Sequence, residues 1–301
     1  MRIVFMGTPE FAVPSLNRLV QAGYEIPFVV TVPDKPAGRG QQLRPSPVKT
    51  YALEKGIPVL QPEKLREPDF VAALQAASPD VMVVVAFRML PEVVWKIPRL
   101  GTFNLHSSLL PEYRGAAPIN WAVINGERTS GVTTFLIDDK IDTGNILLQR
   151  KTDIPDEWTA GDLHDHLMET GSELVLETVA RLERGDIQPV PQIHSLAVHP
   201  APKIFKEDCL IRWDQPAEAV RNHIRGLSPY PGAWTTIQDK QLKIFYVTLT
   251  GEPSDVQAGE YISDGKTLRF ACRDQWLLID DLQMEGKKRM KTEDFLRGFK
   301  M

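Results

Sequence analysis

Cysteine is scarce in this sequence, and the scarcity narrows the kinds of protein that it can encode. Only Cys209 and Cys272 occur among the 301 residues, and they form no Cys-x-x-Cys pair. Reduced thiols in a cytoplasm are therefore the default expectation, and the two cysteines form no recognisable metal-ligand pattern. The six histidines offer no metal site either, because His164 and His166 lie two residues apart and point to different sides of a helix. We expect no metal.

Long apolar runs are also missing. No stretch approaches the roughly 18 consecutive apolar residues that a membrane-spanning helix needs. The N-terminal MRIVFMGTPEF has a short apolar run that Glu10 interrupts, so it is typical of a first β-strand and not of a signal peptide. We therefore expect a cytoplasmic protein with no membrane partner, and we also expect a monomer.

An excess of positive charge is the third absence. The chain has a net charge of −4. Residues 1–190 carry 19 basic and 24 acidic residues, and residues 191–301 carry 16 basic and 15 acidic residues. Because neither part is strongly basic, a nucleic-acid partner would need a local basic patch and not a field over the whole surface.

What the sequence does contain is an alternation of strand-like and helix-like stretches over its first 185 residues. The strongest apolar run, VMVVVAF, is apolar throughout, as a strand covered on both faces should be. The alternation predicts a parallel sheet in a doubly wound α/β domain. The strand-like runs are RIVFM (2–6), IPFVVTV (26–32), PVL (58–60), VMVVVAF (81–87) and TFNLH (102–106).

The pattern changes in the last third of the chain. A proline-containing stretch without periodicity, 188–206, is predicted to be a linker between a catalytic domain at 1–187 and a second domain at 207–301. The second domain has closely spaced short strands, which are typical of a small β-barrel. Its clearest strand-like runs are AWTTI, LKIFYVTLT, TLRFAC and WLLIDDLQM.

Two polar residues stand on one face of the strand TFNLH. Asn104 and His106 are two apart, so their side chains project together, and the strand ends directly after His106. Open α/β sheets bind ligands at the carboxyl ends of their strands, which favours a site here. The alternative is a strand-end pair whose polar atoms bond to loop backbone.

An aspartate in a later turn is a third candidate. The stretch LIDDKIDTGNIL holds three aspartates, and Asp142 precedes Thr-Gly at the tip, where its side chain can reach a neighbouring strand end. A turn aspartate often accepts only local backbone hydrogen bonds, and this alternative suits Asp138 and Asp139 better.

Asn104, His106 and Asp142 together have a natural division of roles. The amide can donate to an oxyanion, and the carboxylate can orient the imidazole and favour its protonated form. The imidazole would then move a proton through its other nitrogen. Ser107 and Ser108 lack the G-x-S-x-G elbow of a nucleophilic serine, so the nucleophile is expected to come from a substrate.

A basic stretch, DKPAGRGQQLRPSPVK at 34–49, is a candidate for phosphate contacts. It is long and polar for a connecting loop, and its four cations face a single Asp34. A solvated loop with incidental charge is the alternative, and the role of a second basic cluster at 287–291 is left open. The cations of the loop are Lys35, Arg39, Arg44 and Lys49.

The stretch NLHSSLLPEYRGAAPINWAVINGE, with the later IDTG, closely resembles the folate-dependent formyltransferases. This resemblance implies a Rossmann-like N-terminal domain, a linker and a C-terminal β-barrel of the OB type. It also implies that Asn104, His106 and Asp142 are catalytic. The S-L-L-P loop would lie beside the folate, and its residues here are Ser108, Leu109, Leu110 and Pro111.

Two further stretches, FMGTPEFAVPSL and APKIFKED, narrow the resemblance to members that act on methionyl-tRNA. The implied reaction transfers the formyl group of the co-substrate 10-formyltetrahydrofolate to the α-amino group of methionyl-initiator tRNA for translation initiation. The loop at 34–49 would bind the acceptor end. Arg88 stands where members tend to carry a small residue, which leaves the pterin contacts open.

Three other functions fit parts of this pattern. A formyltransferase could act on a small amine, such as a sugar nucleotide or glycinamide ribonucleotide, although the second domain favours an RNA acceptor. Hydrolysis of formyltetrahydrofolate would use the same three residues with water as the nucleophile. A non-catalytic nucleic-acid-binding protein would leave these residues without a purpose.

Overall fold

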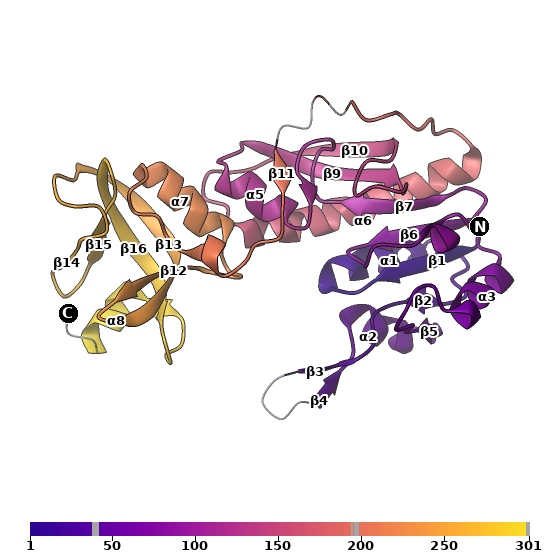
Figure 1. Cartoon of the computed structure of the whole chain (residues 1–301), viewed down its shortest axis with the longest axis horizontal. Coiled ribbons are helices and arrows are strands. Elements are labelled where there is room, and N and C mark those ends of the chain that lie inside the picture. Colours follow the sequence, from indigo (N-terminus) through magenta and orange to yellow (C-terminus); the bar gives the residue numbers. More distant parts are fainter. Residues whose placement is uncertain (38–41, 194, 196–198, 299–301) are drawn as a thin grey trace. The chain divides into compact units, whose positions relative to one another are not determined.

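The computed structural model describes residues 1–37, 42–193, 195 and 199–298. The chain, drawn in Figure 1, forms two compact units. Each unit consists of more than one chain segment. The first unit contains residues 1–115, 130–152 and 164–200, and the second contains 116–129, 153–163 and 201–301. The boundaries predicted from the sequence, 1–187, 188–206 and 207–301, stay a prediction.

A seven-stranded sheet forms the centre of the first unit. Its strand order is β10-β9-β7-β6-β1-β2-β5, and the strands from β5 to β7 are parallel whereas β9 runs antiparallel to β7. The predicted doubly wound, Rossmann-like sheet is therefore confirmed. The strands are β1 (Ile3–Gly7), β2 (Val29–Val30), β5 (Val59–Leu60), β6 (Val81–Val85), β7 (Thr102–His106), β9 (Thr129–Leu136) and β10 (Ile146–Asp153).

Apolar side chains bury both faces of this sheet. Met82 and Val84 of β6 pack with Phe70 of α3, while Val83 and Val85 alternate with them and are fully buried on the opposite face. Helices therefore cover both faces. In the first unit they are η1 (Glu10–Ala12), α1 (Val13–Gln21), α2 (Pro47–Glu54), α3 (Pro68–Ala77) and α4 (Glu92–Trp95); α6 (Ala160–Arg184) begins in the second unit and continues into the first.

The segment 34–49 contains a β-hairpin. Strands β3 (Lys35–Ala37) and β4 (Gln42–Arg44) are antiparallel, and Figure 1 shows them extending away from the large sheet. The sequence predicts a long polar loop at 34–49, whereas Lys35–Ala37 and Gln42–Arg44 pair as the two strands of a hairpin. Pro36 has no N–H group, which hides an edge-strand pairing of this kind from sequence patterns.

Closely spaced antiparallel strands make up most of the second unit, as predicted. The strand order is β12-β13-β16-β15-β14, with β17 beside β16, and register shifts along β13 bend the sheet so that it curls like part of a barrel. Trp213 stacks on Phe270 in its core, with ring centroids 4.5 Å apart. The strands are β12 (Ala233–Ile237), β13 (Lys240–Pro253), β14 (Tyr261–Ser263), β15 (Leu268–Ala271), β16 (Gln275–Met284) and β17 (Met290–Lys291).

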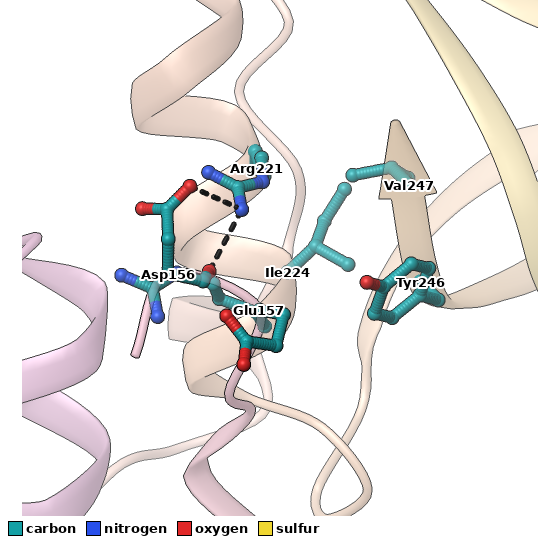
Figure 2. A pocket seen from close by; sticks show the side chains of 7 residues that line it. Asp156, Glu157, Arg221, Ile224, Tyr246 and Val247 are labelled. Carbon is teal, nitrogen blue, oxygen red and sulfur yellow. Dashed lines mark hydrogen bonds and ion pairs between the residues drawn. The ribbon is translucent and has the colours of Figure 1, made fainter. Parts of the chain in front are cut away.

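Helices complete the second unit. The same unit holds a small cavity of about 10 Å³, which Ile224, Tyr246 and Val247 line (Figure 2). Beside this cavity, Arg221 donates to Asp156 at 2.9 Å. A cavity of this size holds at most one water molecule. The helices are α5 (Pro118–Ile124), η3 (Glu207–Cys209), α7 (Ala217–Gly226) and α8 (Thr292–Gly298), and the short strand β11 (Pro200–Ala201) lies where the first unit ends and the second begins. Within the described residues, no helix has the length and apolar character needed to cross a bilayer.

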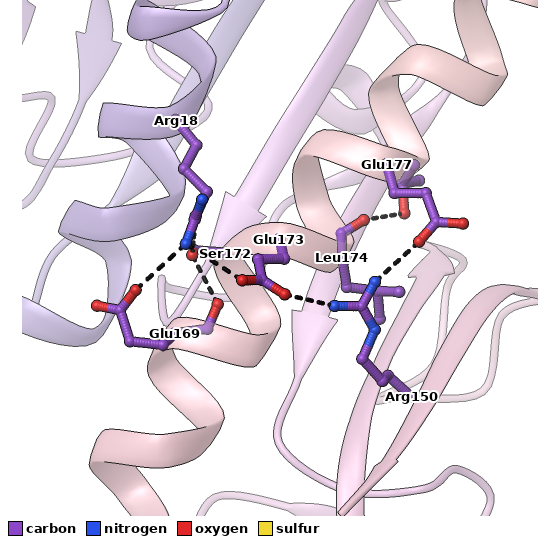
Figure 3. A network of polar contacts seen from close by, with 8 residues as sticks. Arg18, Arg150, Glu169, Ser172, Glu173, Leu174 and Glu177 are labelled. Carbon is purple, nitrogen blue, oxygen red and sulfur yellow. Dashed lines mark hydrogen bonds and ion pairs between the residues drawn. The ribbon is translucent and has the colours of Figure 1, made fainter.

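A network of ion pairs ties β10 and α1 to α6 in the first unit (Figure 3). Arg18 donates to Ser172 at 2.6 Å and pairs with Glu173 at 3.4 Å. Arg150 of β10 pairs with the same Glu173 at 2.7 Å and with Glu177 at 3.0 Å. Partly exposed pairs add little free energy of folding, but this network fixes the position of the strand that follows the turn containing Asp142.

Candidate active site

Asn104 and His106 lie on β7, at the carboxyl edge of the sheet. The strand ends at His106, as predicted, and His106 stands opposite Thr133 of the neighbouring β9. Asn104 is partly exposed, whereas His106 is buried. The two residues therefore share a face beside the ends of β1 and β6.

The turn between β9 and β10 brings Asp142 to His106. The distance between Asp142 Oδ2 and His106 Nδ1 is 3.8 Å, and the two side chains are only 13% and 7% exposed. Asp142 has a φ angle of 54°, in the left-handed region that non-glycine residues seldom adopt. The backbone N–H of Gly115 donates to Asp142 Oδ2 at 2.9 Å. Asp142, which the sequence predicted to reach a neighbouring strand end, is thus held beside the His106 imidazole.

The second nitrogen of His106 bonds to the protein. Its Nε2 lies 2.9 Å from the carbonyl oxygen of Tyr113, which can only accept, so Nε2 carries a hydrogen. A neutral ring then presents the lone pair of Nδ1 toward Asp142. The sequence predicted that the nitrogen turned away from Asp142, which is Nε2, would move the proton. This prediction is wrong for this arrangement, because the Tyr113 carbonyl bonds to Nε2.

The amide of Asn104 has no bonded partner among the described residues, and it is not buried. Asparagine side chains within folded proteins normally bond to the protein or to water. A free amide at the carboxyl edge of a sheet can therefore donate to a ligand oxygen.

The Ser108–Pro111 loop follows β7 and is fixed by one buried threonine. Thr133 Oγ1 donates to the Ser108 carbonyl at 2.6 Å and accepts from the Leu110 N–H at 3.1 Å. Gln149 Nε2 donates to the Leu110 carbonyl at 2.9 Å. Ser108 and Leu110 are buried, while Leu109 and Pro111 are partly exposed. The loop is thus held to β9 and β10 by its own backbone.

Arg88 lies just beyond the end of β6 and binds backbone. Its guanidinium donates to the carbonyls of Pro62 at 2.8 Å and Glu63 at 2.9 Å, and partial burial lowers its pKa. The buried Nε of Arg88 has no partner within the described part of the chain. Arg88, which stands where members of the resembled family tend to carry a small residue, therefore joins the loop after β6 to the loop at Pro62 and Glu63.

The basic residues predicted for phosphate contacts have different surroundings. Lys35 and Arg44 stand opposite each other in the hairpin and form no ion pair with any described residue. Lys49 instead bonds to Asp34 at 2.5 Å and to Gln61 at 2.8 Å, and the pKa of Asp34 is lowered chiefly by the bond from Lys49. Arg39 lies outside the described residues.

Part of the cluster at 287–291 has a structural role. Arg289 bonds to both carboxylate oxygens of Asp281, at 2.9 and 3.0 Å, and lies over the Phe245 ring at 4.3 Å. Lys291 lies 3.7 Å from the same carboxylate. Arg289 and Lys291 thus share the one negative charge of Asp281 within the second unit.

One residue close to the site escaped the sequence analysis. Gln192 comes from the predicted linker, is buried, and donates to the carbonyls of Asp142 at 2.9 Å and Gly144 at 2.8 Å. Nothing in its sequence surroundings marks a glutamine in an irregular stretch as part of a site. In the described residues, no group of three or more His, Cys, Asp or Glu side chains is arranged to hold a metal ion.

Comparison with known proteins identifies relatives over the whole chain. The formyl transferase family model matches residues 1–179, and the formyl transferase C-terminal domain matches residues 203–300. A methionyl-tRNA formyltransferase from Bacteroides thetaiotaomicron is 50% identical over 310 residues, covering 100% of this chain and 96% of that protein. One from Citrifermentans bemidjiense is 47% identical over 304 residues, covering 100% and 94%.

Solved structures share the fold at lower identity. An N-formyltransferase from Helicobacter canadensis, in complex with folinic acid and dTDP-3-aminofucose, has a TM-score of 0.68 and 21% identity, with 96% of this chain and 99% of that chain covered. HypX from Aquifex aeolicus, in complex with tetrahydrofolic acid, has a TM-score of 0.67 and 21% identity, covering 98% of this chain and 47% of that chain. The predicted fold class is confirmed.

The role of Thr133 can be tested by Thr133→Val. The change keeps the shape of the side chain but leaves the Ser108 carbonyl and the Leu110 N–H without a buried partner, so the free energy of unfolding should fall by about 1–3 kcal/mol. Chemical denaturation measures this. Thr236→Val, on an exposed position of β12, is the matched control and should be neutral. Equal stability of the two variants would contradict the role of Thr133.

Proposed function

This chain belongs to the formyl transferase family, and we propose that it transfers the formyl group of 10-formyltetrahydrofolate to the α-amino group of methionyl-initiator tRNA. The observation that carries the proposal is 50% identity over the full chain with a protein named methionyl-tRNA formyltransferase. The product, N-formylmethionyl-tRNA, would serve translation initiation, so we also propose that the protein acts in the cytoplasm.

The nucleophile needs little activation. A free α-amine has a pKa of about 7.7–8.0, and the neighbouring ester of an aminoacyl-tRNA should lower it. Much of the amine is therefore neutral near pH 7. The demanding tasks are holding the amine against the formyl carbon, which can contribute about 7–11 kcal/mol, and stabilising the negative oxygen that develops. These tasks suit a site built from rigid strand ends.

Asn104 would stabilise the developing oxyanion. The amine nitrogen bonds to the formyl carbon, the carbon–N10 bond of the donor breaks, and the carbonyl oxygen is negatively charged in between. The Asn104 amide, which bonds to no described residue, can donate to this oxygen. One such donor contributes about 10²–10³ in rate.

His106 and Asp142 would move the proton that the amine loses. The Tyr113 carbonyl keeps a hydrogen on Nε2, so Nδ1 is the nitrogen that can accept this proton. The Asp142 carboxylate, 3.8 Å away, stabilises the resulting imidazolium. The proton then passes to the departing N10, directly or through water. General acid–base catalysis of this kind contributes about 10²–10⁴ in rate.

The folate would lie beside the loop formed by Ser108, Leu109, Leu110 and Pro111. The hydrogen bonds from Thr133 and Gln149 to the backbone of this loop support the proposal, since a wall held by buried polar groups keeps its shape when a ligand binds. Arg88, bonded to the backbone of Pro62 and Glu63, would stiffen a second wall.

The β3–β4 hairpin would contact the acceptor end of the tRNA. Lys35 and Arg44 support this because no described carboxylate pairs with them, whereas Lys49 already bonds to Asp34. Phosphates bind such cations through charge and release counterions. Arg39 belongs to the same predicted contact set, and Lys49 would contribute mainly by ordering the base of the hairpin.

The choice of acceptor can be tested directly. The protein is supplied with the formyl donor and with methionyl-initiator tRNA, uncharged tRNA, a dTDP-linked amino sugar, glycinamide ribonucleotide or buffer, and formylated products are measured against free formate. We expect formyl-methionine only with the charged tRNA. Faster formylation of a small amine would favour the alternative acceptor, and formate released in buffer alone would indicate hydrolysis.

The three proposed catalytic residues can be replaced singly. Asn104→Ala, His106→Ala and Asp142→Asn should each lower kcat at least tenfold, because each removes a group that acts in the transition state. Steady-state kinetics and circular dichroism would check rate and fold. Asp139→Asn, in the same turn, is the control and should keep full rate. A folded His106→Ala protein with unchanged kcat would refute the assignment.

Charge reversal tests the hairpin. The double variant Lys35→Glu, Arg44→Glu should raise KM for the charged tRNA at least tenfold at low salt and flatten the salt dependence of kcat/KM, because two phosphate contacts are lost. KM for the formyl donor should not change. Lys64→Glu, an exposed lysine in the first unit, is the control. Unchanged KM and salt dependence in the double variant would exclude the hairpin.

A further inference from the structure

Three consecutive residues hold both partners of the His106–Asp142 pair. The Tyr113 carbonyl accepts from His106, and the Gly115 N–H donates to the Asp142 carboxylate. Between them, the Arg114 side chain donates to Gln192 Oε1, from Nη2 at 2.5 Å and from Nε at 3.2 Å. Residues 113–115 therefore form a bracket, and Gln192 is its link to the other side of the turn.

Gln192 uses both ends of its amide within this network. Oε1 accepts from Arg114, while Nε2 donates to the carbonyls of Asp142 and Gly144. The side chain is only 7% exposed, so bonds lost here are not readily replaced by water. Val190 exchanges two backbone hydrogen bonds of 2.8 Å with Ile146, which fixes the chain two residues before Gln192.

The turn needs such support from outside. Its own bonds, from Lys140 N–H and Thr143 Oγ1 to Asp138, connect the turn only with itself. Lys140 and Ile141 are exposed, and the positive φ of Asp142 costs conformational energy. Among the described contacts, those from Gly115 and Gln192 are the ones that fix Asp142 against the rest of the first unit.

We propose that Gln192 is a positioning residue for the reaction proposed above, and that it sets the separation of Asp142 from His106. It touches neither the imidazole of His106 nor the carboxylate of Asp142, because its amide binds the Arg114 side chain and the backbone carbonyls of Asp142 and Gly144. The inference rests on the proposed role of Asp142. It assigns the segment at 190–192, predicted as a linker, to the catalytic site.

A second contact from the same part of the chain steadies the bracket. The His199 carbonyl accepts from the Tyr113 N–H at 2.7 Å, and the two rings stack with centroids 5.4 Å apart. Glu112 bonds to His199 Nδ1 at 2.8 Å. His199 therefore fixes Tyr113, whose carbonyl bonds to His106. Gln192, from the same part of the chain, binds the backbone of Asp142.

The test compares Gln192→Met with Gln188→Met, which changes an exposed glutamine of the same segment. A displacement of about 1 Å at a catalytic group can cost up to a hundredfold in rate, so we expect kcat of Gln192→Met to fall by about tenfold to a hundredfold. KM for both substrates should stay within about twofold. Amide hydrogen exchange should accelerate at 113–117 and 140–146, and the Gln188→Met protein should match the unchanged chain in every measurement.

Repeating the change in an Asp142→Asn background separates positioning from a general structural role. If Gln192 acts through Asp142, Gln192→Met should not lower the remaining single-turnover rate further. An equal loss in both backgrounds would overturn the inference, as would a Gln192→Met protein with unchanged kcat. Unchanged kcat in Asp142→Asn alone would instead overturn the proposed catalytic role of Asp142, while the acceptor assay would still decide the proposed function. If Gln192→Met does not fold, Gln192→Glu keeps the acceptor for Arg114, removes the donor, and should show the same loss.

Discussion

The candidate site depends on keeping a carboxylate and an imidazole together at a nearly dry sheet edge. Two polar groups that are about one-tenth exposed lose most of their hydration, and this is tolerable only if their remaining hydrogen-bonding positions are filled. One backbone group bonds to each side chain here, since the Tyr113 carbonyl accepts from His106 and the Gly115 N–H donates to one oxygen of Asp142. Backbone partners two residues apart cannot move independently, so the same segment sets the positions of both side chains.

Strand β9 extends this constraint to the surrounding loops. Its pairing with β7 places Thr133 opposite His106, and the hydroxyl of Thr133 holds the loop that begins at Ser108. The turn that contains Asp142 leaves the other end of β9 and leads into β10, which Arg150 ties to α6. The antiparallel strand β9, which lies between β7 and β10, thus connects the proposed catalytic groups with the proposed folate wall.

The sequence predicted those features that leave a periodic or turn signal. Alternation along TFNLH gave the shared face of Asn104 and His106, and the Asp-Thr-Gly turn gave a reason to bring Asp142 near them. Gln192 left no such signal, because a side chain that binds carbonyls fifty residues away in the chain has no characteristic spacing. The same holds for the segments 116–129 and 153–163, whose place in the second unit depends on long-range packing.

Basic residues in a sequence overstate the charge that is free for a nucleic acid. Lys49 and Arg289 each bond to a carboxylate, so binding a phosphate would require breaking or sharing that pair. Lys35 and Arg44 face no such competition from described residues, and they lie on a narrow two-stranded element that extends from the first unit. Attraction of the tRNA would therefore come from cations that, like Lys35 and Arg44, pair with no described carboxylate, and a local patch of this kind would allow a chain with a net charge of −4 to bind a polyanion.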